Sequence, residues 1–411
     1  MFAFALVACS SGGETTVTVN PVTISTTSLP DGMQSVAYTA SLAATGGTIP
    51  YTWTIAGGSL PGDLAIDPNT GVISGTPSTG ETSTFTVRVT DSAQPATTAT
   101  QSLSITITIP LTNRIQAAQA TVASNSNCTT IGDFYWEIGD TSGSLVSGAV
   151  GTTYSSSTAM DIASASKLIF GAYVVESFKT DLSKADAQAM RMGSGYVSLE
   201  YASCLLSTVK TVDDCYQTKH LLTNVHNSDY TDADKGKFYY NGGHFQWYAD
   251  VGLKLGSLDN AGLAAEMKNQ LGTELNIAYG SPQLAGGAYM SADDYARFLR
   301  KIISGGLAIK DHLGEDPVCT LPGTSCPTAV YSPASPYNWH YSWGHWIEDD
   351  SLIGDDGAFS SPGAFGFYPW IDSSKQYYGI LARRSDTSGA YKESAMCGRL
   401  IRAAFLIGVA Q

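Results

Sequence analysis

The most informative stretch of the sequence is Ile162-Ala163-Ser164-Ala165-Ser166-Lys167-Leu168-Ile169-Phe170. A serine and a lysine stand three residues apart at the head of an apolar run that is compatible with a helix. A serine hydroxyl is a weak nucleophile until a base takes its proton. A lysine can be that base when burial or nearby positive charge lowers its pKa. We therefore expect Ser164 as a nucleophile and Lys167 as its base, with an N-capped helix and a solvated lysine as the alternative.

A second polar element follows in the stretch Phe238-Tyr239-Tyr240-Asn241. It contains the spacing Tyr-x-Asn, with Tyr239 and Asn241 as the matching residues. A phenolate beside a lysine can relay a proton to a leaving group. We expect Tyr239 to share the acid and base roles with Lys167, and Asn241 to orient Lys167 or to bind the substrate.

In this order the two motifs resemble those of the penicillin-recognising serine hydrolases. These include class C β-lactamases, D,D-peptidases, family VIII carboxylesterases and 6-aminohexanoate-oligomer hydrolases. Residues 286–299 are similar to the family's glycine turn and following helix, and residues 341–346 to the strand before its third motif. The resemblance spans about residues 125–410. It implies an α/β (α+β) domain with an antiparallel sheet flanked by helices, and a serine acyl-enzyme. The sequence itself contains no feature that requires a metal or organic cofactor.

The third motif departs from the family pattern. Family members carry Lys-Thr-Gly or His-x-Gly, whereas the matching stretch here is Ser361-Pro362-Gly363, followed by Ala364-Phe365. A hydroxyl offers a hydrogen bond without charge, which weakens recognition of a carboxylate. The resemblance implies that Ser361 positions substrate. It also implies an oxyanion hole made by the backbone N–H groups of Ser164 and of a residue after Gly363, for which we expect Phe365.

The chain changes character near Pro110. Before it, β-branched residues alternate with polar ones at residues 16–19, 84–89 and 103–109, with Pro and Gly between these runs. This pattern predicts a β-sandwich of short strands. Residues 60–67 and 70–77 resemble the Ig-like, cadherin-like repeat of bacterial surface proteins, which implies a spacer or adhesion module. Asp67 and Asp91 are expected to cap turns, with calcium binding as the alternative.

Beyond Pro110, helical periodicity recurs at residues 111–120, 292–303 and 394–406, and strand-like runs lie at 134–138 and 376–382. We therefore expect a signal remnant, lipoprotein site and tether at 1–20, an Ig-like sandwich at 21–110, and the hydrolase-like domain at 111–411. Tryptophans 339, 343, 346 and 370 are expected to pack the core, and some of them to line a pocket.

Composition limits the possible partners. Hydrophobic residues make up 43% of the chain and charged residues 14%, which excludes intrinsic disorder. The net charge of −14 makes a nucleic-acid partner unsuitable, because phosphate binding needs clustered Lys and Arg. No apolar run approaches the roughly 18 residues of a membrane span.

The seven cysteines indicate export. Leu6-Val7-Ala8-Cys9 resembles a bacterial lipoprotein processing site, so Cys9 is expected to carry a lipid, with an ordinary secretory signal as the alternative. Six cysteines remain, and six allow 15 pairings. Cys204 and Cys215 are close in sequence, as are Cys319 and Cys326, which leaves Cys128 with Cys397. We expect structural disulfides in an exported protein that is periplasmic, extracellular or anchored to the outer membrane through Cys9.

These observations predict an exported serine hydrolase that cleaves an ester or amide bond in a small or oligomeric substrate. Two other functions stay open. One is a β-lactamase or D,D-peptidase, which the residue at Ser361 disfavours. The other is a catalytically silent surface binding protein, in which the Ig-like domain is the active part.

Overall fold

The computed structural model describes residues 20–178, 182–350 and 356–411. The chain forms two compact units, one ending at Arg114 and the other beginning at Ile115, so that helix α1 (Leu111–Ser124) contains the division. Cys9 and the strand expected at residues 16–19 lie outside the described residues.

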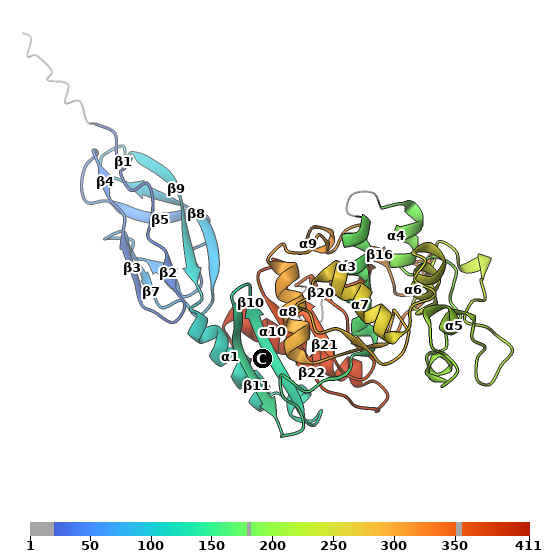
Figure 1. The fold of residues 1–411 in the computed structure, drawn as a ribbon. Helices are drawn as coiled ribbons and strands as arrows, with labels where there is room; N and C mark the ends of the chain where they lie inside the picture. The colour runs from blue at the N-terminus through green and yellow to red at the C-terminus, as the bar shows by residue number, and fades with distance from the viewer. Residues whose placement is uncertain (1–19, 179–181, 351–355) are drawn as a thin grey trace, which may run out of the picture. The chain divides into compact units, whose positions relative to one another are not determined.

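The smaller unit is a β-sandwich (Figure 1). One sheet has the order β2-β9-β8-β5 and the other β3-β7-β6, with β1 paired to β4. Side chains from both sheets, among them Trp53, Ile73, Val87 and Ile105, meet in one core. The strands are β1 (Thr23–Ile24), β2 (Gly32–Met33), β3 (Tyr38–Ser41), β4 (Ala44–Thr45), β5 (Thr52–Gly58), β6 (Leu64–Ile66), β7 (Val72–Gly75), β8 (Glu81–Thr90) and β9 (Thr98–Thr108).

Alternation in the sequence accounts for this core. In β8 and β9 the residues Phe85, Val87, Val89, Leu103 and Ile105 are buried, while most of the residues between them face outward. Two strands that bury every second residue can share one core only if their registers match. They pair antiparallel from Glu81 opposite Ile107 to Thr90 opposite Thr98.

The carboxylates of Asp67 and Asp91 hold turns of this unit. Asp67 accepts hydrogen bonds from the backbone N–H groups of Asn69 at 2.8 Å and Thr70 at 3.2 Å. Asp91 accepts from those of Thr97 at 2.6 Å and Thr48 at 3.1 Å. These bonds hold the pKa of both carboxyl groups below its usual value. Both residues therefore do the turn-capping work that the sequence predicted.

The larger unit is built on an antiparallel sheet with the order β11-β10-β22-β21-β20-β19-β18-β16. β22 is buried along its whole length, as expected for a strand covered on both faces. The strands are β10 (Phe134–Asp140), β11 (Gly143–Val150), β16 (Val318–Cys319), β18 (His340–Ser342), β19 (His345–Glu348), β20 (Ala358–Ser360), β21 (Tyr368–Ile371) and β22 (Tyr378–Ala382).

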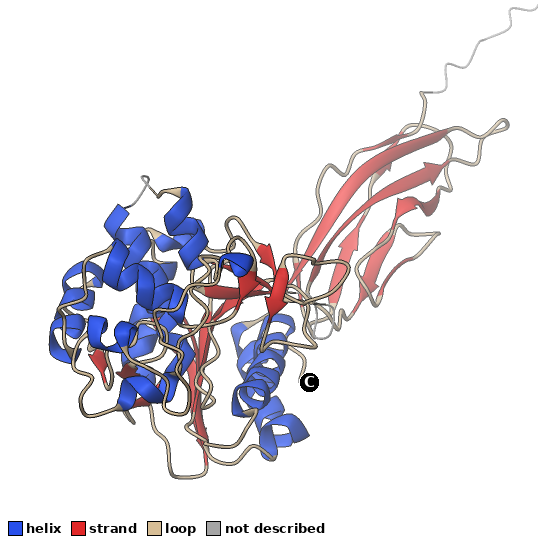
Figure 2. Ribbon diagram, turned by 90° about the vertical axis from the view of Figure 1, so that its right-hand side faces the viewer, coloured by secondary structure: helices blue, strands red, loops and turns tan. Residues whose placement is uncertain are grey.

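This sheet lies between two groups of helices (Figure 2). Helix α8 contacts β10, β21 and β22, and α10 contacts β21 and β22. The periodicity at residues 292–303 coincides with α8, and that at 394–406 lies within α10. The helices of this unit are α2 (Ser126–Thr129), α3 (Ser166–Phe178), α4 (Lys184–Met190), α5 (Val212–Gln217), α6 (Gly243–Trp247), α7 (Asn260–Leu271), α8 (Ala292–Ile303), α9 (Ile309–His312) and α10 (Ala390–Ile407).

Two small sheets and a hairpin position the site. β12 (Met160–Asp161) pairs with β15 (Ala288–Met290), which pairs with β14 (Ala278–Tyr279), and β13 (Phe238–Tyr239) pairs in parallel with β17 (Ala329–Tyr331). Residues 341–346, expected as one strand, instead form a hairpin that turns at Trp343–Gly344. Gly344 has φ +82°, and a Cβ there would lie 2.4 Å from the carbonyl oxygen of Lys167. The turn therefore rests directly on helix α3.

Disulfides join Cys128 to Cys397, Cys204 to Cys215 and Cys319 to Cys326, which is the pairing expected from the sequence. The first of these ties α2 to α10. None of the helices in the described ranges has the length and apolarity needed to cross a bilayer.

Candidate active site

Ser164 lies at the junction of two helical segments. It occupies the middle of a short 3₁₀ turn (Ala163–Ala165) that leads directly into α3. Lys167, in the first turn of α3, is only 4% exposed. Its Nζ lies 2.8 Å from the Ser164 Oγ and 2.8 Å from the carbonyl oxygen of Ala285. The structure thus brings together the serine and the lysine that the sequence paired.

Burial lowers the pKa of the Lys167 ammonium from about 10.5 to about 7. Both hydrogen-bond partners of Lys167 are neutral oxygens. A lysine with a pKa near 7 is half unprotonated at neutral pH and can accept a proton from the serine. The site therefore meets the chemical requirement for a general base.

The backbone around Ser164 is held from several sides. The preceding residue, Ala163, has φ +45°, a left-handed conformation that is unusual for alanine. The Ile162 N–H donates to the Ala288 carbonyl at 3.2 Å. The Ala288 N–H donates to the Ser166 hydroxyl at 3.1 Å, and the Tyr295 hydroxyl donates to the Ala165 carbonyl at 2.8 Å. Strand β15 and helix α8 thus hold the turn that presents the nucleophile.

The tyrosine that faces Ser164 is Tyr240, which corrects our expectation of Tyr239. Lys167 Nζ lies 4.7 Å from the centre of the Tyr240 ring, and Tyr240 and Ser164 line the same pocket. The Tyr239 ring instead packs against Tyr331, with ring centres 5.5 Å apart. Consecutive side chains in extended backbone point to opposite faces. Tyr239 and Tyr240 therefore point in opposite directions, and Tyr240 is the one on the side of Ser164.

Burial raises the pKa of the Tyr240 phenol to about 12, while hydrogen bonding to Ser164 and Trp346 acts in the opposite direction. The Tyr240 ring stacks on Trp346, with ring centres 5.1 Å apart. Tyr240 is therefore a neutral phenol at pH 7, and the group whose pKa suits a base is Lys167.

The side-chain hydrogen bonds of Asn241 in the described ranges go to Leu199 and Gly243, and not to Lys167 as we expected. Its side-chain oxygen accepts hydrogen bonds from the N–H groups of Leu199 at 3.0 Å and Gly243 at 2.7 Å. Its amide nitrogen donates to the Leu199 carbonyl at 3.3 Å. With Tyr240 as the motif tyrosine, the third motif position is Gly242. Asn241 thus joins two loops instead of contacting substrate.

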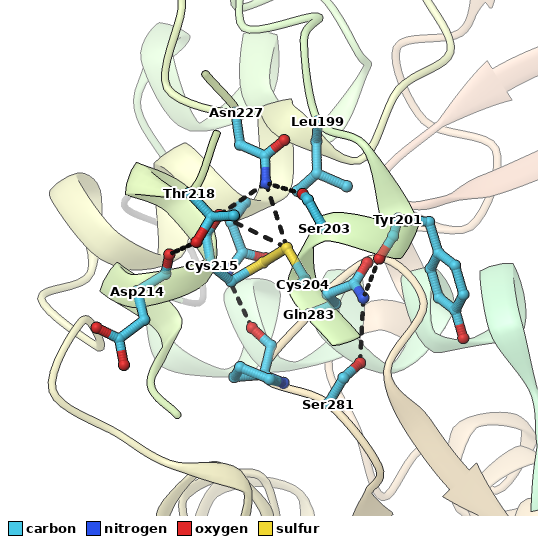
Figure 3. Close-up of a disulfide and its surroundings, with 12 residues drawn as sticks. Leu199, Tyr201, Ser203, Cys204, Asp214, Cys215, Thr218, Asn227, Ser281 and Gln283 are labelled. Carbon is cyan, nitrogen blue, oxygen red and sulfur yellow. Dashed lines mark hydrogen bonds between the residues drawn. A yellow bond between two sulfur atoms is a disulfide. The ribbon is translucent and has the colours of Figure 1, made fainter. Parts of the chain in front are cut away.

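The loop that Asn241 holds is also braced by a disulfide (Figure 3). Next to Cys204–Cys215, the Asn227 amide donates to the Ser203 hydroxyl at 3.0 Å and the Cys215 carbonyl at 2.8 Å. Gln283 donates to the Tyr201 carbonyl at 3.2 Å. Gln283 lies two residues before Ala285, whose carbonyl binds Lys167. The disulfide loop therefore packs against the segment that orients the lysine.

The Ser361 hydroxyl is bonded to the backbone of Ser164, which is the third difference from our expectations, since we expected it to position substrate. This hydroxyl donates to the backbone carbonyl of Ser164 at 2.9 Å, and the residue is 2% exposed. A Cβ on Gly363 would lie 2.1 Å from the carbonyl oxygen of Ile162. Gly363 is therefore required because two backbones touch, and the segment after β20 is pressed against the nucleophile turn.

Ala364 stands where we expected Phe365 beside the nucleophile. Ala364 lines the pocket with Ser164, and its backbone N–H makes no hydrogen bond within the described ranges. The Phe365 ring lies beneath the Arg384 guanidinium at 4.8 Å and near Tyr201 at 6.4 Å. In the turn after Gly363, which the Gly366 N–H closes on the Gly363 carbonyl at 2.9 Å, Ala364 and not Phe365 borders the pocket.

The histidines nearest the site are structural. The Ser194 N–H donates to Nδ1 of His244 at 3.1 Å, so the other nitrogen carries the hydrogen and donates to the Tyr239 carbonyl at 2.9 Å. Burial lowers the pKa of His244 to about 4. His345 is also buried, with its pKa lowered to about 4 by burial. Among the residues that the structure describes, no three His, Cys, Asp or Glu side chains gather as metal ligands would.

The sequence analysis did not assign three residues of the site, which are Tyr240, Ala364 and Ala285. Ala285 contributes through its backbone carbonyl. The stretch Phe238-Tyr239-Tyr240-Asn241 contained a signal, since it holds two tyrosines, but motif spacing alone selected the first. Trp339 and Trp346 line the pocket, whereas Trp343 and Trp370 are buried in the core. This agrees with the expectation of a mixed role for the tryptophans.

Comparison with known proteins supports this architecture in both units. Residues 14–109 match the family model described as Putative Ig domain. Among solved structures, the octameric penicillin-binding protein homologue from Pyrococcus abyssi aligns at 13% identity over 72% of this chain and 78% of that one, with a TM-score of 0.53. The larger unit has a penicillin-binding-protein-like fold.

Two further structures are similar at lower scores. The D-stereospecific amidohydrolase from Streptomyces aligns at 13% identity over 70% of this chain and 97% of its own, with a TM-score of 0.44. A β-lactamase from Mycobacterium bovis aligns at 11% identity over 66% and 95%, with a TM-score of 0.43. A search of functionally curated proteins returned no significant match.

Proposed function

We propose that the larger unit is a serine hydrolase that cleaves an ester or amide bond through an acyl-enzyme on Ser164. The observation that carries the proposal is the 2.8 Å contact between the Ser164 hydroxyl and Lys167 Nζ, combined with burial that lowers the lysine pKa to about 7. A buried lysine has a free-energy cost, and a strongly shifted pKa in a pocket is a mark of functional sites.

In the acylation step, neutral Lys167 takes the proton of the Ser164 hydroxyl while the oxygen attacks the substrate carbonyl carbon. The carbonyl π-bond electrons move to the oxygen, which is stabilised by the backbone N–H groups of Ser164 and Ala364. When the intermediate collapses, the bond to the leaving atom breaks. The proton held by Lys167 then passes to that atom, with the neutral Tyr240 hydroxyl as the bridging donor.

Deacylation repeats these steps with water as the nucleophile. Lys167, neutral again, takes a proton from the water as its oxygen attacks the acyl carbon. The Ser164 oxygen leaves and recovers its proton, and the acid product departs. Ser361, which binds the Ser164 carbonyl at 2.9 Å, keeps the nucleophile turn in place through both halves of the cycle.

A neutral ester or amide fits the site better than an anionic β-lactam. The third motif offers Ser361 where family members carry a cation or histidine, and that hydroxyl is already bonded to the protein backbone. A substrate carboxylate at this position would lose water without gaining a charged partner. For this reason we place esterase or amidase activity before β-lactamase or D,D-peptidase activity.

We further propose that the protein is exported and anchored through a lipid on Cys9, with the Ig-like unit as a spacer. Disulfides such as Cys128–Cys397 are typical of oxidising compartments. Metabolic labelling with a palmitate analogue should modify the parent protein and leave Cys9→Ser unlabelled. Labelling of both to the same extent would contradict the anchor.

The hydrolase proposal is tested with p-nitrophenyl acetate. We expect the parent protein to hydrolyse it and Ser164→Ala to lose about a thousandfold or more in kcat/KM. Mass spectrometry of a slowly deacylating ester should place the acyl group on the peptide that contains Ser164. Equal rates in parent and variant would remove Ser164 from the mechanism.

A further inference from the structure

We propose that the pocket beside Ser164 receives the leaving group of the substrate, and that this group is uncharged, apolar and about the size of an aromatic ring. The inference rests on the proposed function, because it names the substrate class of the same site. Three observations support it. The pocket wall is mostly apolar, its aromatic rings form a continuous row that begins at Tyr240, and polar side chains of the wall are hydrogen-bonded within the protein.

The pocket opens directly at Ser164, and together with the solvent space at its mouth it measures about 480 Å³. Most of its wall is aromatic or aliphatic. The lining residues include Pro333, Tyr337, Trp339, Trp346, Tyr391 and Ala395. A wall of this chemistry suits the apolar part of a small molecule, because burying such a group releases water from apolar surface on both sides.

The aromatic wall begins at the proton donor. The Tyr240 ring stacks on Trp346 at 5.1 Å, Trp346 packs edge-on against Trp339 at 6.0 Å, and Trp339 stacks on Tyr337 at 4.9 Å. A general acid must face the atom that departs. Because Tyr240 both contacts Ser164 and starts this wall, the substrate group that follows the departing atom extends along the wall.

Three polar side chains of the wall are bonded within the protein. The Trp339 indole N–H donates to Asp350, and the Tyr391 hydroxyl donates to the Pro333 carbonyl at 2.8 Å. Lys392 is the charged side chain among the described lining residues, and its Nζ donates to the Ser335 carbonyl at 2.7 Å. That bond is exposed to solvent, whereas along the aromatic wall itself a charged leaving group would be desolvated without a charged partner.

The wall is supported from behind. The buried Arg399 guanidinium lies 5.6 Å from the Tyr337 ring and 5.4 Å from the Trp339 ring. Arg399 is in turn paired with Asp350 at 3.0 Å and Glu348 at 3.4 Å. This arrangement keeps the two rings in place before the substrate arrives, so that little ordering cost remains at binding.

Small side chains leave the space that the leaving group fills. Ala334 and Ala395 line the pocket and are nearly fully buried. A leucine at Ala395 would project from α10 into this volume. Ala403, also on α10, is half-buried and does not line the pocket, which makes Ala403→Leu the matched control.

The decisive experiment compares esters that vary on one side of the bond only. Benzyl acetate and ethyl acetate share the acyl group, whereas ethyl phenylacetate carries the ring on the acyl side. We expect Ala395→Leu to lower the ratio of kcat/KM for benzyl acetate to that for ethyl acetate by about tenfold or more. Ala334→Leu should act in the same direction, and Ala403→Leu should keep the parent ratio. If Ala395→Leu instead lowers selectivity for ethyl phenylacetate, the pocket holds the acyl group and the proposal is overturned.

A binding measurement separates this inference from the proposed function. In the Ser164→Ala background, N-benzylacetamide should bind at least about tenfold more tightly than 4-(acetamidomethyl)benzoate, because the carboxylate must lose its water. Ala395→Leu should abolish this preference. If the parent protein hydrolyses no ester but N-benzylacetamide still binds more tightly than the carboxylate, the hydrolase proposal is rejected and the pocket assignment stands. Tighter binding of the carboxylate, or no preference, would reject the pocket assignment alone.

Discussion

Asp91 in the smaller unit and Lys167 in the larger unit are buried ionisable residues that their surroundings hold in opposite ways. In the smaller unit, the buried carboxylate of Asp91 is paired with the backbone N–H groups of Thr48 and Thr97. Its non-glycine residues with positive φ are Ser35 and Asp63, among the residues described there, and both lie in turns. In the larger unit, Lys167 is buried beside neutral oxygens only, and Ala163 takes a left-handed conformation next to the nucleophile.

This contrast indicates where the protein accepts a free-energy cost. The smaller unit bonds its buried Asp91 carboxylate to backbone N–H groups and has Ser35 and Asp63, its described non-glycine residues of positive φ, in turns, as a spacer that only needs stability would do. The larger unit keeps a shifted lysine and a strained alanine within a few residues of each other. Such costs persist where chemistry requires them, because the surrounding packing is strong enough to impose them.

Lys167→Met should have the largest effect. We expect a loss of about a thousandfold or more in ester hydrolysis, because the base is removed. We also expect the free energy of unfolding at pH 6 to rise by roughly 2–4 kcal/mol, since a lysine whose folded pKa is lowered destabilises the fold while it is charged. Rate measurements and urea unfolding check both.

The pH dependence of that stability gain has a fixed sign. The folded protein releases the Lys167 proton near pH 7, and the unfolded chain releases it near 10.5. Between these values the unfolded chain binds more protons, so the stability of the parent rises with pH and approaches that of the variant. A gain that grows with pH over this interval would contradict the buried, shifted lysine.

Tyr240→Phe should come next in size. Loss of the phenol is expected to lower kcat/KM by about 100-fold or more, because the donor to the leaving atom is lost. Tyr239→Phe removes a hydroxyl from a ring that packs on Tyr331 and should change the rate by less than about threefold. The reverse order of effects would restore Tyr239 as the motif tyrosine.

Gly363→Ala should destabilise the larger unit. The new Cβ would lie 2.1 Å from the Ile162 carbonyl, so the nucleophile turn must shift. We expect a loss of about 2–4 kcal/mol in the free energy of unfolding, together with reduced activity. Gly57→Ala in β5 is the control, since its Cβ would have 3.7 Å to the nearest atom, the Thr86 hydroxyl. Similar losses of unfolding free energy in both variants would mean that the close approach of Gly363 to Ile162 does not cause the destabilisation.

The pH profile of kcat/KM should show a more modest change. The fraction of neutral Lys167 rises through a pKa of about 7, so the rate should increase about tenfold from pH 6 to pH 8. The ascending limb should have unit slope at low pH and disappear in Ser164→Ala. A rate that falls over this interval would mean that the charged lysine is the active form.

Asp91→Asn should have the smallest effect, and it should be confined to the smaller unit. The backbone N–H bonds to this carboxylate lower its pKa, so its contribution is present above the ordinary aspartate pKa and is lost as pH falls through the folded value. The variant should unfold slightly earlier at pH 7, with a difference from the parent that shrinks as the pH falls below the ordinary aspartate pKa. Ester hydrolysis should be unchanged, and a loss of activity would show that the two units are coupled.

The spacing of apolar residues along the chain was enough to predict helices and strands that bury one face. Periodicity placed α8 at Ala292–Ile303, and alternation placed β8 and β9, because a helix or strand that buries one face must repeat apolar residues at its own period. Ser164 and Lys167 could be paired for the same reason, since three residues along one helical turn bring two side chains together wherever the helix lies.

Contacts between residues that lie far apart in the sequence became known from the three-dimensional structure alone. Tyr239 and Tyr240 are neighbours in sequence, yet pairing of β13 with β17 turns one toward Tyr331 and the other toward Ser164. The hydroxyl of Ser361 and the amide of Asn241 looked like substrate contacts until packing placed backbone groups within their reach. No local pattern carries this information, because a side chain's partner depends on how several segments pack, and a shift of one residue reverses the face it presents.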